Sequence, residues 1–150
     1  MIIRVIGNVT EAFDTYIAHG CNAQGVMGSG VAKAVREKWP KAYDDYKLFL
    51  PTYIKKDTSE ALGNIMFSYQ PDGKVIINCI TQNYYGRDGM KYVSYDAIDE
   101  CFLRLSRQLK EPGISIPKIG AGLGGGRWEV IEEIIKHRMK NFTVTVWELD

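Results

Sequence analysis

Residues 113–135 read GISIPKIGAGLGGGRWEVIEEII, which is a short apolar run, then a glycine-rich loop, then a stretch with helical spacing. Gly113–Pro117 is typical of a buried strand, and a helix is expected over about Arg127–Met139. The inward face of that helix is expected to carry Trp128, Ile131, Ile134 and Ile135, and its outward face Glu132, Glu133 and Lys136. A strand, a loop and a helix in this order predict a unit of an α/β fold.

The rest of the chain repeats this alternation of apolar runs and helical stretches. Further strands are expected at Ile2–Ile6, Thr15–His19, Ile65–Tyr69, Val75–Ile80 and Phe142–Glu148. One helix opens at Ser29-Gly30 and ends before Pro40, a second covers Lys41–Phe49, and a third runs from Ser94 to Pro112-Gly113. The alternation predicts an α/β protein with one six-stranded, mainly parallel sheet and helices on both faces. We find no repeat or linker, so a single domain over residues 1–150 is expected.

The 150 residues carry 19 Lys and Arg against 18 Asp and Glu, which gives a net charge of +1. This balance excludes the basic surface that bulk nucleic-acid binding needs. No apolar run approaches the roughly 20 residues that span a bilayer, and the N-terminus lacks the pattern of a signal peptide. We therefore expect a cytoplasmic protein with no membrane partner. A chain of this length buries a core without obligate association, so a monomer is expected.

Three cysteines, Cys21, Cys79 and Cys101, form no CxxC pair and are interpreted as reduced, buried thiols. His19 lies close enough to Cys21 to suggest a metal site or a thiol enzyme. The only other histidine in the sequence is His137, on a helix face among basic residues. A zinc site with three or four protein ligands is hard to assemble from this set, so neither a metal nor a cofactor is expected.

Two glycine-rich loops each follow a predicted strand and lead to a helix. The first is GVMGSG at residues 25–30, and the second is GAGLGGG at residues 120–126. Free N–H groups at the start of a helix favour anions, and glycine lets the backbone approach a ligand closely. We interpret both loops as phosphate cradles. The alternative is a pair of flexible turns without a ligand.

Gly120, Gly122 and Gly125 satisfy the G-x-G-x-x-G spacing of a dinucleotide site. That fingerprint normally opens the first βαβ unit, whereas here only 25 residues follow Gly125. The sequence contains no G-x-x-x-x-G-K-[ST] motif of the kind that P-loop nucleotide hydrolases carry. The expected ligand is a nucleotide diphosphate that is held chiefly by backbone N–H groups.

Four segments taken together resemble the macrodomain family. They are GNVT at residues 7–10, HGCNAQGVMGSGVA at residues 19–32, NCITQ at residues 78–82 and PKIGAGL at residues 117–123. Their order and spacing match over essentially the whole chain, which is most similar to the branch of ADP-ribose-1″-phosphate phosphatases and terminal ADP-ribose glycohydrolases. The resemblance implies a three-layer α/β/α sandwich with a mixed, mainly parallel sheet, and a small-molecule ADP-ribose derivative as ligand.

The resemblance also implies roles for individual residues. Asn8 stands where the family has an aspartate that accepts a hydrogen bond from adenine, and an asparagine carbonyl can accept the same bond without a charge. Val9 beside it is expected as a further ligand contact, and Asn22 matches an asparagine that contacts the distal ribose. The two diphosphate loops correspond to Gly28, Ser29, Gly30 and Val31, and to Gly120, Ala121, Gly122, Leu123 and Gly124.

The catalytic residues of the glycohydrolases have no match. Those enzymes use a lysine and an aspartate where this chain has Gln82 and Gly124, so their mechanism is excluded, and Gln82 is expected only to contact the ligand. Phosphatase-like members keep a histidine just before the Cys-Asn pair, and His19 stands there. Its imidazole is expected to face the 1″ position as a general acid or phosphate-orienting group, with covalent catalysis as an open alternative. The structural alternative is a buried histidine bonded to the backbone. Ser29 either binds phosphate or caps its helix.

Residues 81–92 form a polar loop rich in aromatic side chains, which we interpret as a lid over the site. Tyr84 or Tyr85 is expected to stack on the ligand, and Arg87 or Lys91 to meet a terminal phosphate. Asp88 is the nearest carboxylate that can act as a base. For each of these residues a solvated position in the loop is the alternative.

Three functions remain open from the sequence. The first is an ADP-ribose-binding hydrolase that removes phosphate from ADP-ribose-1″-phosphate, with His19 and Asp88 as catalytic residues. The second is a non-catalytic module that binds free ADP-ribose, a related cyclic nucleotide or an ADP-ribosylated partner. The third is a hydrolase that removes ADP-ribose from protein or nucleic acid, which Gln82 and Gly124 weaken.

Overall fold

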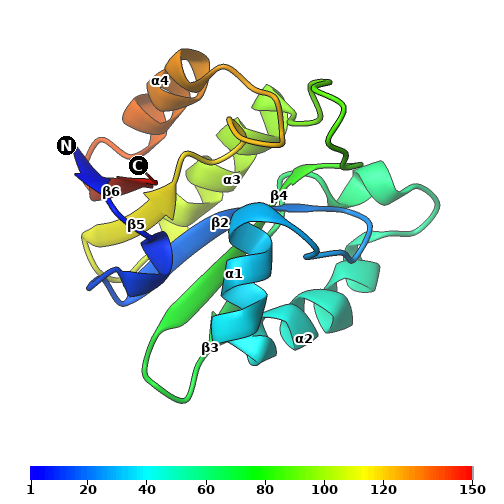
Figure 1. Ribbon diagram of the computed structural model, residues 1–150, viewed down its shortest axis with the longest axis horizontal. Coiled ribbons are helices and arrows are strands. Elements are labelled where there is room, and N and C mark those ends of the chain that lie inside the picture. The colour runs from blue at the N-terminus through cyan, green and yellow to red at the C-terminus, as the bar shows by residue number, and fades with distance from the viewer. Residues whose placement is uncertain (150) are drawn as a thin grey trace.

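The computed structural model describes residues 1–149, and its strands and helices are interspersed along the chain (Figure 1). The strands are β1 (Ile2–Ile6), β2 (Tyr16–Asn22), β3 (Ile65–Tyr69), β4 (Val75–Gln82), β5 (Gly113–Pro117) and β6 (Thr143–Glu148). The helices are α1 (Gly30–Lys38), α2 (Pro40–Phe49), α3 (Tyr95–Gln108) and α4 (Trp128–Arg138), with short 3-10 turns at Val9–Glu11, Leu50–Tyr53 and Thr58–Ala61. Every predicted strand and helix is confirmed, with bounds that differ by a few residues.

All six strands form one sheet in the order β1-β6-β5-β2-β4-β3. Each neighbouring pair is parallel except β3 and β4, which are antiparallel. The mixed, mainly parallel sheet is therefore confirmed. Because β1, β6, β5, β2 and β4 run in the same direction, their carboxyl ends lie along one edge, where ligands of α/β proteins bind.

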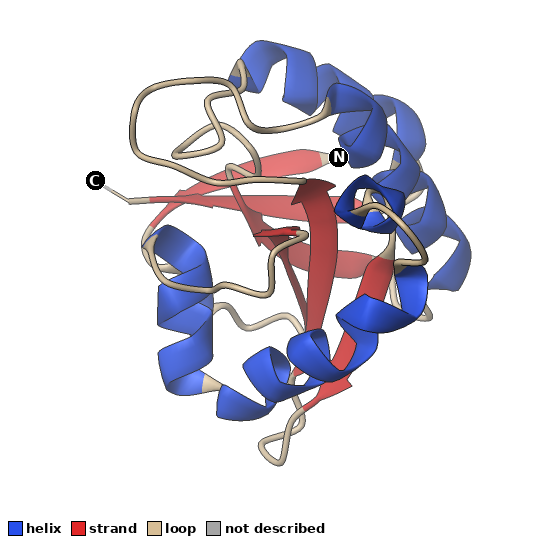
Figure 2. Ribbon diagram, turned by 90° about the vertical axis from the view of Figure 1, so that its right-hand side faces the viewer, coloured by secondary structure: helices blue, strands red, loops and turns tan. Residues whose placement is uncertain are grey.

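Helices cover both faces of the sheet, with α1 and α2 on one side and α3 and α4 on the other (Figure 2). Phe102 and Ile131 belong to the core beneath α3 and α4, whereas Val35 and Tyr46 belong to the cores beneath α1 and α2. The expected three-layer sandwich is confirmed. No helix within residues 1–149 is long and apolar enough to cross a membrane.

Strands β2 and β5 are neighbours near the centre of the sheet, and the connections that follow them run to opposite faces of it. After β2 the chain continues into α1 on one face, and after β5 it continues into α4 on the other. The two strands share a single ladder pair, Ile17 with Ser115. Two residues further along β5 stands Pro117, which has no N–H to donate to β2. The carboxyl ends of β2 and β5 are therefore not joined by the ladder, and the loops that follow them border a crevice.

Two strands run further toward this edge than predicted. β2 ends at Asn22 rather than at His19, and β4 ends at Gln82 rather than at Ile80. The reason is mutual pairing, because Cys21 lies opposite Ile80 and Asn22 lies opposite Gln82. The sequence did not predict these extensions because Asn22 and Gln82 are polar and do not continue the apolar run of either strand. As a result, His19 lies inside the sheet rather than at its end.

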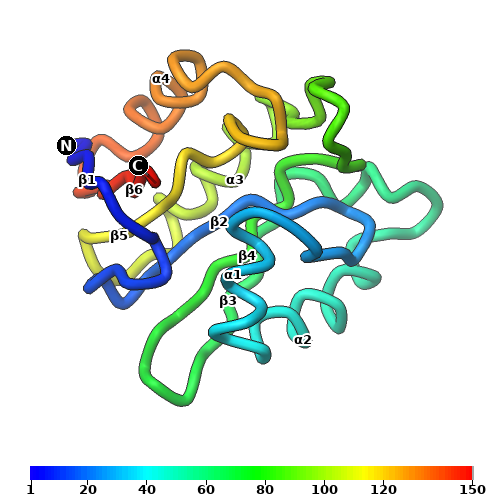
Figure 3. The backbone as a smooth tube through the Cα atoms, in the orientation of Figure 1, coloured from blue at the N-terminus to red at the C-terminus, as the bar shows by residue number. Residues whose placement is uncertain are grey.

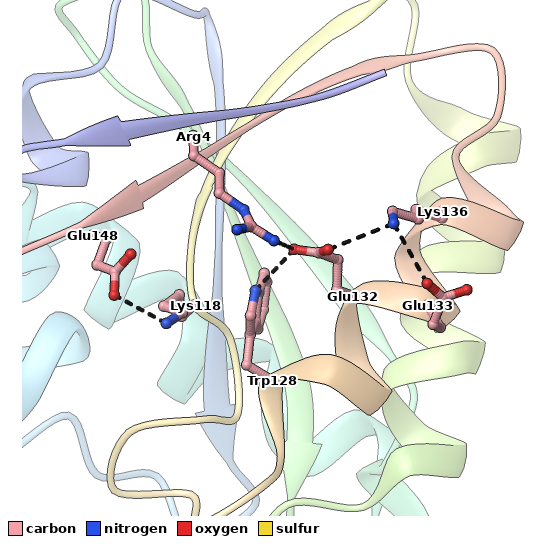
Figure 4. A network of polar contacts seen from close by, with 7 residues as sticks. All are labelled: Arg4, Lys118, Trp128, Glu132, Glu133, Lys136 and Glu148. Atoms are coloured by element: carbon pink, nitrogen blue, oxygen red, sulfur yellow. Dashed lines mark hydrogen bonds and ion pairs between the residues drawn. The ribbon is translucent and has the colours of Figure 1, made fainter.

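The outward position expected for Glu132 is wrong. Its carboxylate is buried and accepts hydrogen bonds from Arg4 Nη2 at 2.6 Å and from Trp128 Nε1 at 2.9 Å (Figure 4). Glu133 and Lys136 are exposed as predicted, and Lys136 pairs with both carboxylates. Burial is the largest single influence and raises the pKa of Glu132. The hydrogen bond and charge of Arg4, together with the Trp128 hydrogen bond and the charge of Lys136, outweigh it and hold the pKa below its usual value. A partner on the edge strand β1 thus turns an expected surface residue inward.

We expect Glu132→Gln to lower the free energy of unfolding by about 1 kcal/mol near neutral pH, because the amide keeps the shape but loses the charge that faces the exposed Arg4. A carboxyl group with a depressed pKa in the folded state stabilises the protein above its unfolded-state pKa of about 4.3. That contribution is lost as the pH falls through the folded value. Urea denaturation near neutral pH and at about pH 3 measures the difference between variant and wild type, which should shrink toward zero in acid. An equal difference at both pH values would contradict the role of the charge.

Candidate ligand-binding site

A cavity of about 740 Å³ opens at the carboxyl edge of the sheet, between the loop after β2 and the loop after β5. It reaches from the end of β6, across β5 and β2, to the end of β4. Its lining includes most of the predicted ligand contacts, namely Asn22, Gly28, Ser29, Gly30, Val31, Gln82, Gly120, Ala121, Gly122, Leu123 and Gly124. The volume lies within the usual range of small-molecule and cofactor sites.

Asn22 shapes the first loop with its side-chain amide. Its Oδ1 accepts hydrogen bonds from Gln24 N and from the Tyr46 hydroxyl, both at 2.9 Å, and its Nδ2 donates to Val26 O at 2.8 Å. Tyr46, fully buried in α2, also accepts from Gly25 N at 3.0 Å. Both ends of the Asn22 amide therefore already have protein partners. The contact of Asn22 with a ribose stays a prediction.

Helix α1 begins at the cavity with its first N–H groups unpaired. Ser29 occupies the N-cap position, but its side chain makes no capping hydrogen bond. The N–H groups of Gly28, Ser29 and Gly30 have no acceptor among the hydrogen bonds of residues 1–149. Gly30 has a φ of +61°, in the left-handed region that favours glycine. The cavity is therefore lined by residues with free N–H groups at the N-terminus of α1, the positive end of the helix dipole.

The loop after β5 is closed by its own backbone. Gly126 N donates to Gly120 O at 2.8 Å, and Gly125 N donates to Gly122 O at 3.1 Å. Gly120 has a φ of +78°, and a Cβ there would lie 2.7 Å from a side-chain carbon of Val93, so only glycine fits. Four N–H groups of this loop have no acceptor in the described chain, namely those of Gly120, Gly122, Leu123 and Gly124. A second set of unpaired donors thus belongs to a loop that lines the other side of the cavity.

The second loop is tied to the end of the predicted lid at Tyr92 and to Val93 after it, and the two segments lie beside one another (Figure 3). Gly124 O accepts hydrogen bonds from Tyr92 N at 2.7 Å and from Val93 N at 3.0 Å. These bonds fix the predicted lid to the glycine-rich loop.

Beyond the end of β4, the predicted lid contributes two further side chains to the cavity. Tyr85 and Arg87 line it, and both are exposed enough to meet a ligand. Tyr84 lies outside the lining, and Lys91 holds its ammonium 4.4 Å from the centre of the Tyr95 ring. Arg87 is therefore the cation of this segment that is placed to meet an anion.

Asp88 lies outside the lining of the cavity. Its carboxylate accepts hydrogen bonds from the Tyr92 hydroxyl at 2.8 Å and from Met90 N at 3.1 Å. The bond from Tyr92, followed by that from Met90, holds the pKa of Asp88 below its usual value. A weakened base outside the cavity does not fit the expected catalytic role.

Asn8, which was expected to contact adenine, and Val9, which was expected as a further ligand contact, also lie outside the lining. Asn8 Oδ1 accepts hydrogen bonds from Thr10 N at 3.0 Å and from Thr10 Oγ1 at 2.8 Å, so it caps the short turn after β1. Val9 is buried in the core with Val35 and Trp39. The geometry therefore gives both residues structural roles.

The β6 end of the cavity has a lining that the sequence reasoning missed. Trp147 and Leu149 lie there, together with the Lys118–Glu148 ion pair at 3.0 Å (Figure 4). Parallel pairing of β5 with β6 brings these residues to the same edge as the glycine loops. The signal that would have found them is positional, because ligand contacts follow the carboxyl ends of neighbouring parallel strands.

His19 is fully buried and does not line the cavity. Its Nε2 lies 2.6 Å from Asn78 Oδ1, and Asn78 Nδ2 donates to Ala42 O of α2. The imidazole therefore packs beneath α2, and the expected position facing the 1″ group is wrong for this residue. Burial lowers the pKa of His19 to about 4, although the hydrogen bond with Asn78 opposes the shift.

Cys21 lines the cavity but is a poor nucleophile. It is 3% exposed, and burial is the main cause that raises the pKa of its thiol far above the usual value. The nearby His19 imidazole, 3.7 Å from Cys21 Sγ, is itself a weak base. Because the thiolate is the reactive form, the pair does not favour thiol catalysis. No three His, Cys, Asp or Glu side chains in the described part of the chain come together in a position to hold a metal ion.

Comparison with known proteins gives this geometry a family context. The family model described as Macro domain matches residues 18–135. The "uncharacterized 17.5 kDa protein in tk-vs intergenic region" of Enterobacteria phage T4 is 32% identical, over 99% of this chain and 98% of the phage protein. An ADP-ribose 1″-phosphate phosphatase of Candida glabrata is 27% identical over 95% of this chain and 96% of the yeast protein. A macrodomain protein from Streptomyces coelicolor has a solved structure with a TM-score of 0.78 and 29% identity, over 98% of both chains.

We expect the His19 imidazole to titrate with a midpoint near 4 rather than 6.5, because burial disfavours its charged form. Unfolded chains take up this proton at about pH 6.5, so His19 makes the protein less stable as the pH falls from there toward the folded value. NMR titration of the imidazole signals measures the midpoint, with the exposed His137 as the second signal. A midpoint near 6.5 for His19 would reveal a solvated imidazole and contradict the buried position.

Proposed function

The chain belongs to the macro domain family, and from that premise we propose that its cavity binds ADP-ribose and that the protein removes phosphate from ADP-ribose 1″-phosphate. One observation carries the binding, namely that two glycine-rich loops with unpaired N–H groups lie on either side of the cavity. Converging backbone donors and a helix N-terminus favour a diphosphate at this place.

The two ends of the cavity differ in chemistry, and the difference supports one direction for the ligand. Trp147 and Leu149 at the β6 end offer apolar surface for a base, and Glu148 can accept a hydrogen bond from a base amino group. At the β4 end, Gln82 offers an amide to a sugar. The ends of β6 and β4 are separated by three strand spacings, roughly 14 Å, which suits a ligand with a diphosphate in its middle.

Phosphate release is proposed as attack of water on the phosphorus of the 1″-phosphate. The bond between phosphorus and the 1″ oxygen breaks, a proton passes from the water to the ribose oxygen, and the products are ADP-ribose and inorganic phosphate. Free N–H groups and Arg87 stabilise the negative charge on the phosphoryl oxygens. We propose no covalent intermediate, because the raised pKa of Cys21 makes its thiol a poor nucleophile.

The Candida glabrata relative supports this reaction, since its name states the activity and nearly its whole length aligns with this chain. A binding module without catalysis is the second candidate, and it is favoured by the fact that His19 and Asp88 both lie outside the cavity. Removal of ADP-ribose from a macromolecule has less support, because neither Gln82 nor Gly124 offers an amine or a carboxylate.

Calorimetry should detect ADP-ribose binding to the wild-type protein, and Gly122→Val should weaken that binding roughly 10–100-fold. A Cβ at Gly122 meets no atom within 4 Å, so the added methyl groups take up cavity space without disturbing the fold. Gly113→Val is the matched control, because a Cβ there lies 2.8 Å from Asp14 Oδ1, outside the cavity lining. The control should lower the melting temperature and leave the affinity unchanged. Equal affinity of wild type and a folded Gly122→Val variant would remove the second loop from the site.

Incubation of the wild-type protein with ADP-ribose 1″-phosphate should release inorganic phosphate, and Arg87→Ala should lower the rate on the order of 100-fold, because one donor to the phosphoryl group is lost. Lys91→Ala provides the comparison, since Lys91 packs on Tyr95 outside the lining and its loss should leave the rate unchanged. Binding of ADP-ribose without phosphate release would refute the phosphatase and favour the binding module.

A further inference from the structure

Thr81, near the end of β4, carries a buried hydroxyl without a partner. The residue is 1% exposed, and within residues 1–149 its Oγ1 is the one buried side-chain oxygen or nitrogen that makes no hydrogen bond. Thr81 lines the cavity. An unpaired buried hydroxyl destabilises the folded state, so its presence beside a ligand cavity calls for a partner that the protein itself does not supply.

An irregularity in the sheet accounts for the placement of Thr81. Along β2 and β4, Cys21 lies opposite Ile80 and Asn22 lies opposite Gln82, which leaves Thr81 without an opposing residue. A β-bulge of this kind re-aims the side chain of the extra residue and is common next to functional sites.

Gly20 of β2 keeps the space at the Thr81 hydroxyl open. A Cβ at Gly20 would lie 2.9 Å from Thr81 Oγ1 and 3.6 Å from a methyl carbon of Ile119. All three residues line the cavity. Gly20 is not among the glycines with positive φ, so this position needs the missing side chain rather than a special backbone conformation. The missing side chain of Gly20 and the buried hydroxyl of Thr81 therefore lie next to one another at the cavity.

We propose that the Thr81 hydroxyl is a specificity-determining group that hydrogen-bonds a hydroxyl of the sugar beyond the diphosphate. This inference rests on the proposed function and adds the residue that distinguishes ADP-ribose from ADP. Thr81 belongs to the β4 end of the cavity, beside Gln82 and away from Trp147 and Leu149, so the sugar rather than the base reaches it.

The chemistry of the Thr81 hydroxyl also favours a sugar. A threonine hydroxyl both donates and accepts hydrogen bonds, which matches a ribose hydroxyl, whereas a fully ionised phosphate only accepts them. A site built to bond a substrate hydroxyl rejects analogues that lack it, because the buried protein group is then left unpaired.

Thr81→Val tests the inference, since valine replaces the hydroxyl by a methyl group of similar size. The variant should bind ADP-ribose roughly 5–10-fold more weakly by calorimetry, with unchanged affinity for ADP, which lacks the sugar. Its melting temperature should be at least that of wild type, because the hydroxyl has no protein partner to lose. Thr81→Ser keeps the hydroxyl and should bind ADP-ribose like wild type.

Ser68→Ala is the matched control for a buried hydroxyl that does have partners. Ser68 Oγ donates to Asp45 Oδ2 at 2.6 Å and accepts from Gln70 Nε2 at 2.8 Å, outside the cavity lining. Its loss should have the opposite effect, with a lower melting temperature and unchanged affinity for both nucleotides.

Two results would overturn the role of Thr81 while leaving the proposed function intact. One is equal ADP-ribose affinity in wild type and Thr81→Val, and the other is an equal loss of affinity for ADP and ADP-ribose. Thr81→Ala also lacks the hydroxyl and should give the same loss of ADP-ribose affinity, which shows that the effect does not depend on how the valine packs. Failure of the wild-type protein to bind ADP-ribose would overturn the proposed function, and the role of Thr81 with it.

Discussion

Strands β2 and β5 are joined by a single ladder pair, Ile17 with Ser115, and the site exists because the two strands part beyond it. Pro117 has no N–H with which to continue the ladder. The loop after β2 then leads to α1 on one face of the sheet, and the loop after β5 leads to α4 on the other. Neither loop has a ladder to satisfy its N–H groups, and a cavity of about 740 Å³ lies between them. The proposed diphosphate would supply the acceptors that the sheet does not.

Polar groups on the protein side of the two loops have hydrogen-bond partners, whereas several polar groups of the residues that line the cavity have none. Behind the first loop, the buried Tyr46 hydroxyl bonds both Asn22 Oδ1 and Gly25 N, and behind the second, Gly124 O accepts two backbone N–H groups. In front, the N–H groups of both loops and the Thr81 hydroxyl have no partner in the described chain. Unsatisfied groups gathered at one cavity, on a scaffold that is otherwise well bonded, are typical of a binding site rather than of poor packing.

The strands, the helices and both glycine loops were predictable from the sequence. Apolar periodicity and glycine spacing are patterns among residues that lie only a few positions apart along the chain. Side-chain direction was not predictable in the same way. The sequence predicts a strand that ends at His19, but pairing with β4 extends β2 to Asn22 and buries the imidazole. Glu132 is drawn inward by Arg4, which lies 128 residues away in the sequence. Trp147 reaches the cavity only because β6 pairs with β5, a contact that no local pattern encodes.

Amide chemical shifts of isotope-labelled protein titrated with ADP-ribose test most directly whether backbone N–H groups hold the diphosphate. Resonances of residues 28–31 and 120–124 should shift together to saturation, while that of Gly73, in the turn between β3 and β4, stays in place. Shifts confined to the smaller hollow beside Lys47 and Leu50, with both glycine loops unchanged, would contradict the assignment of the site.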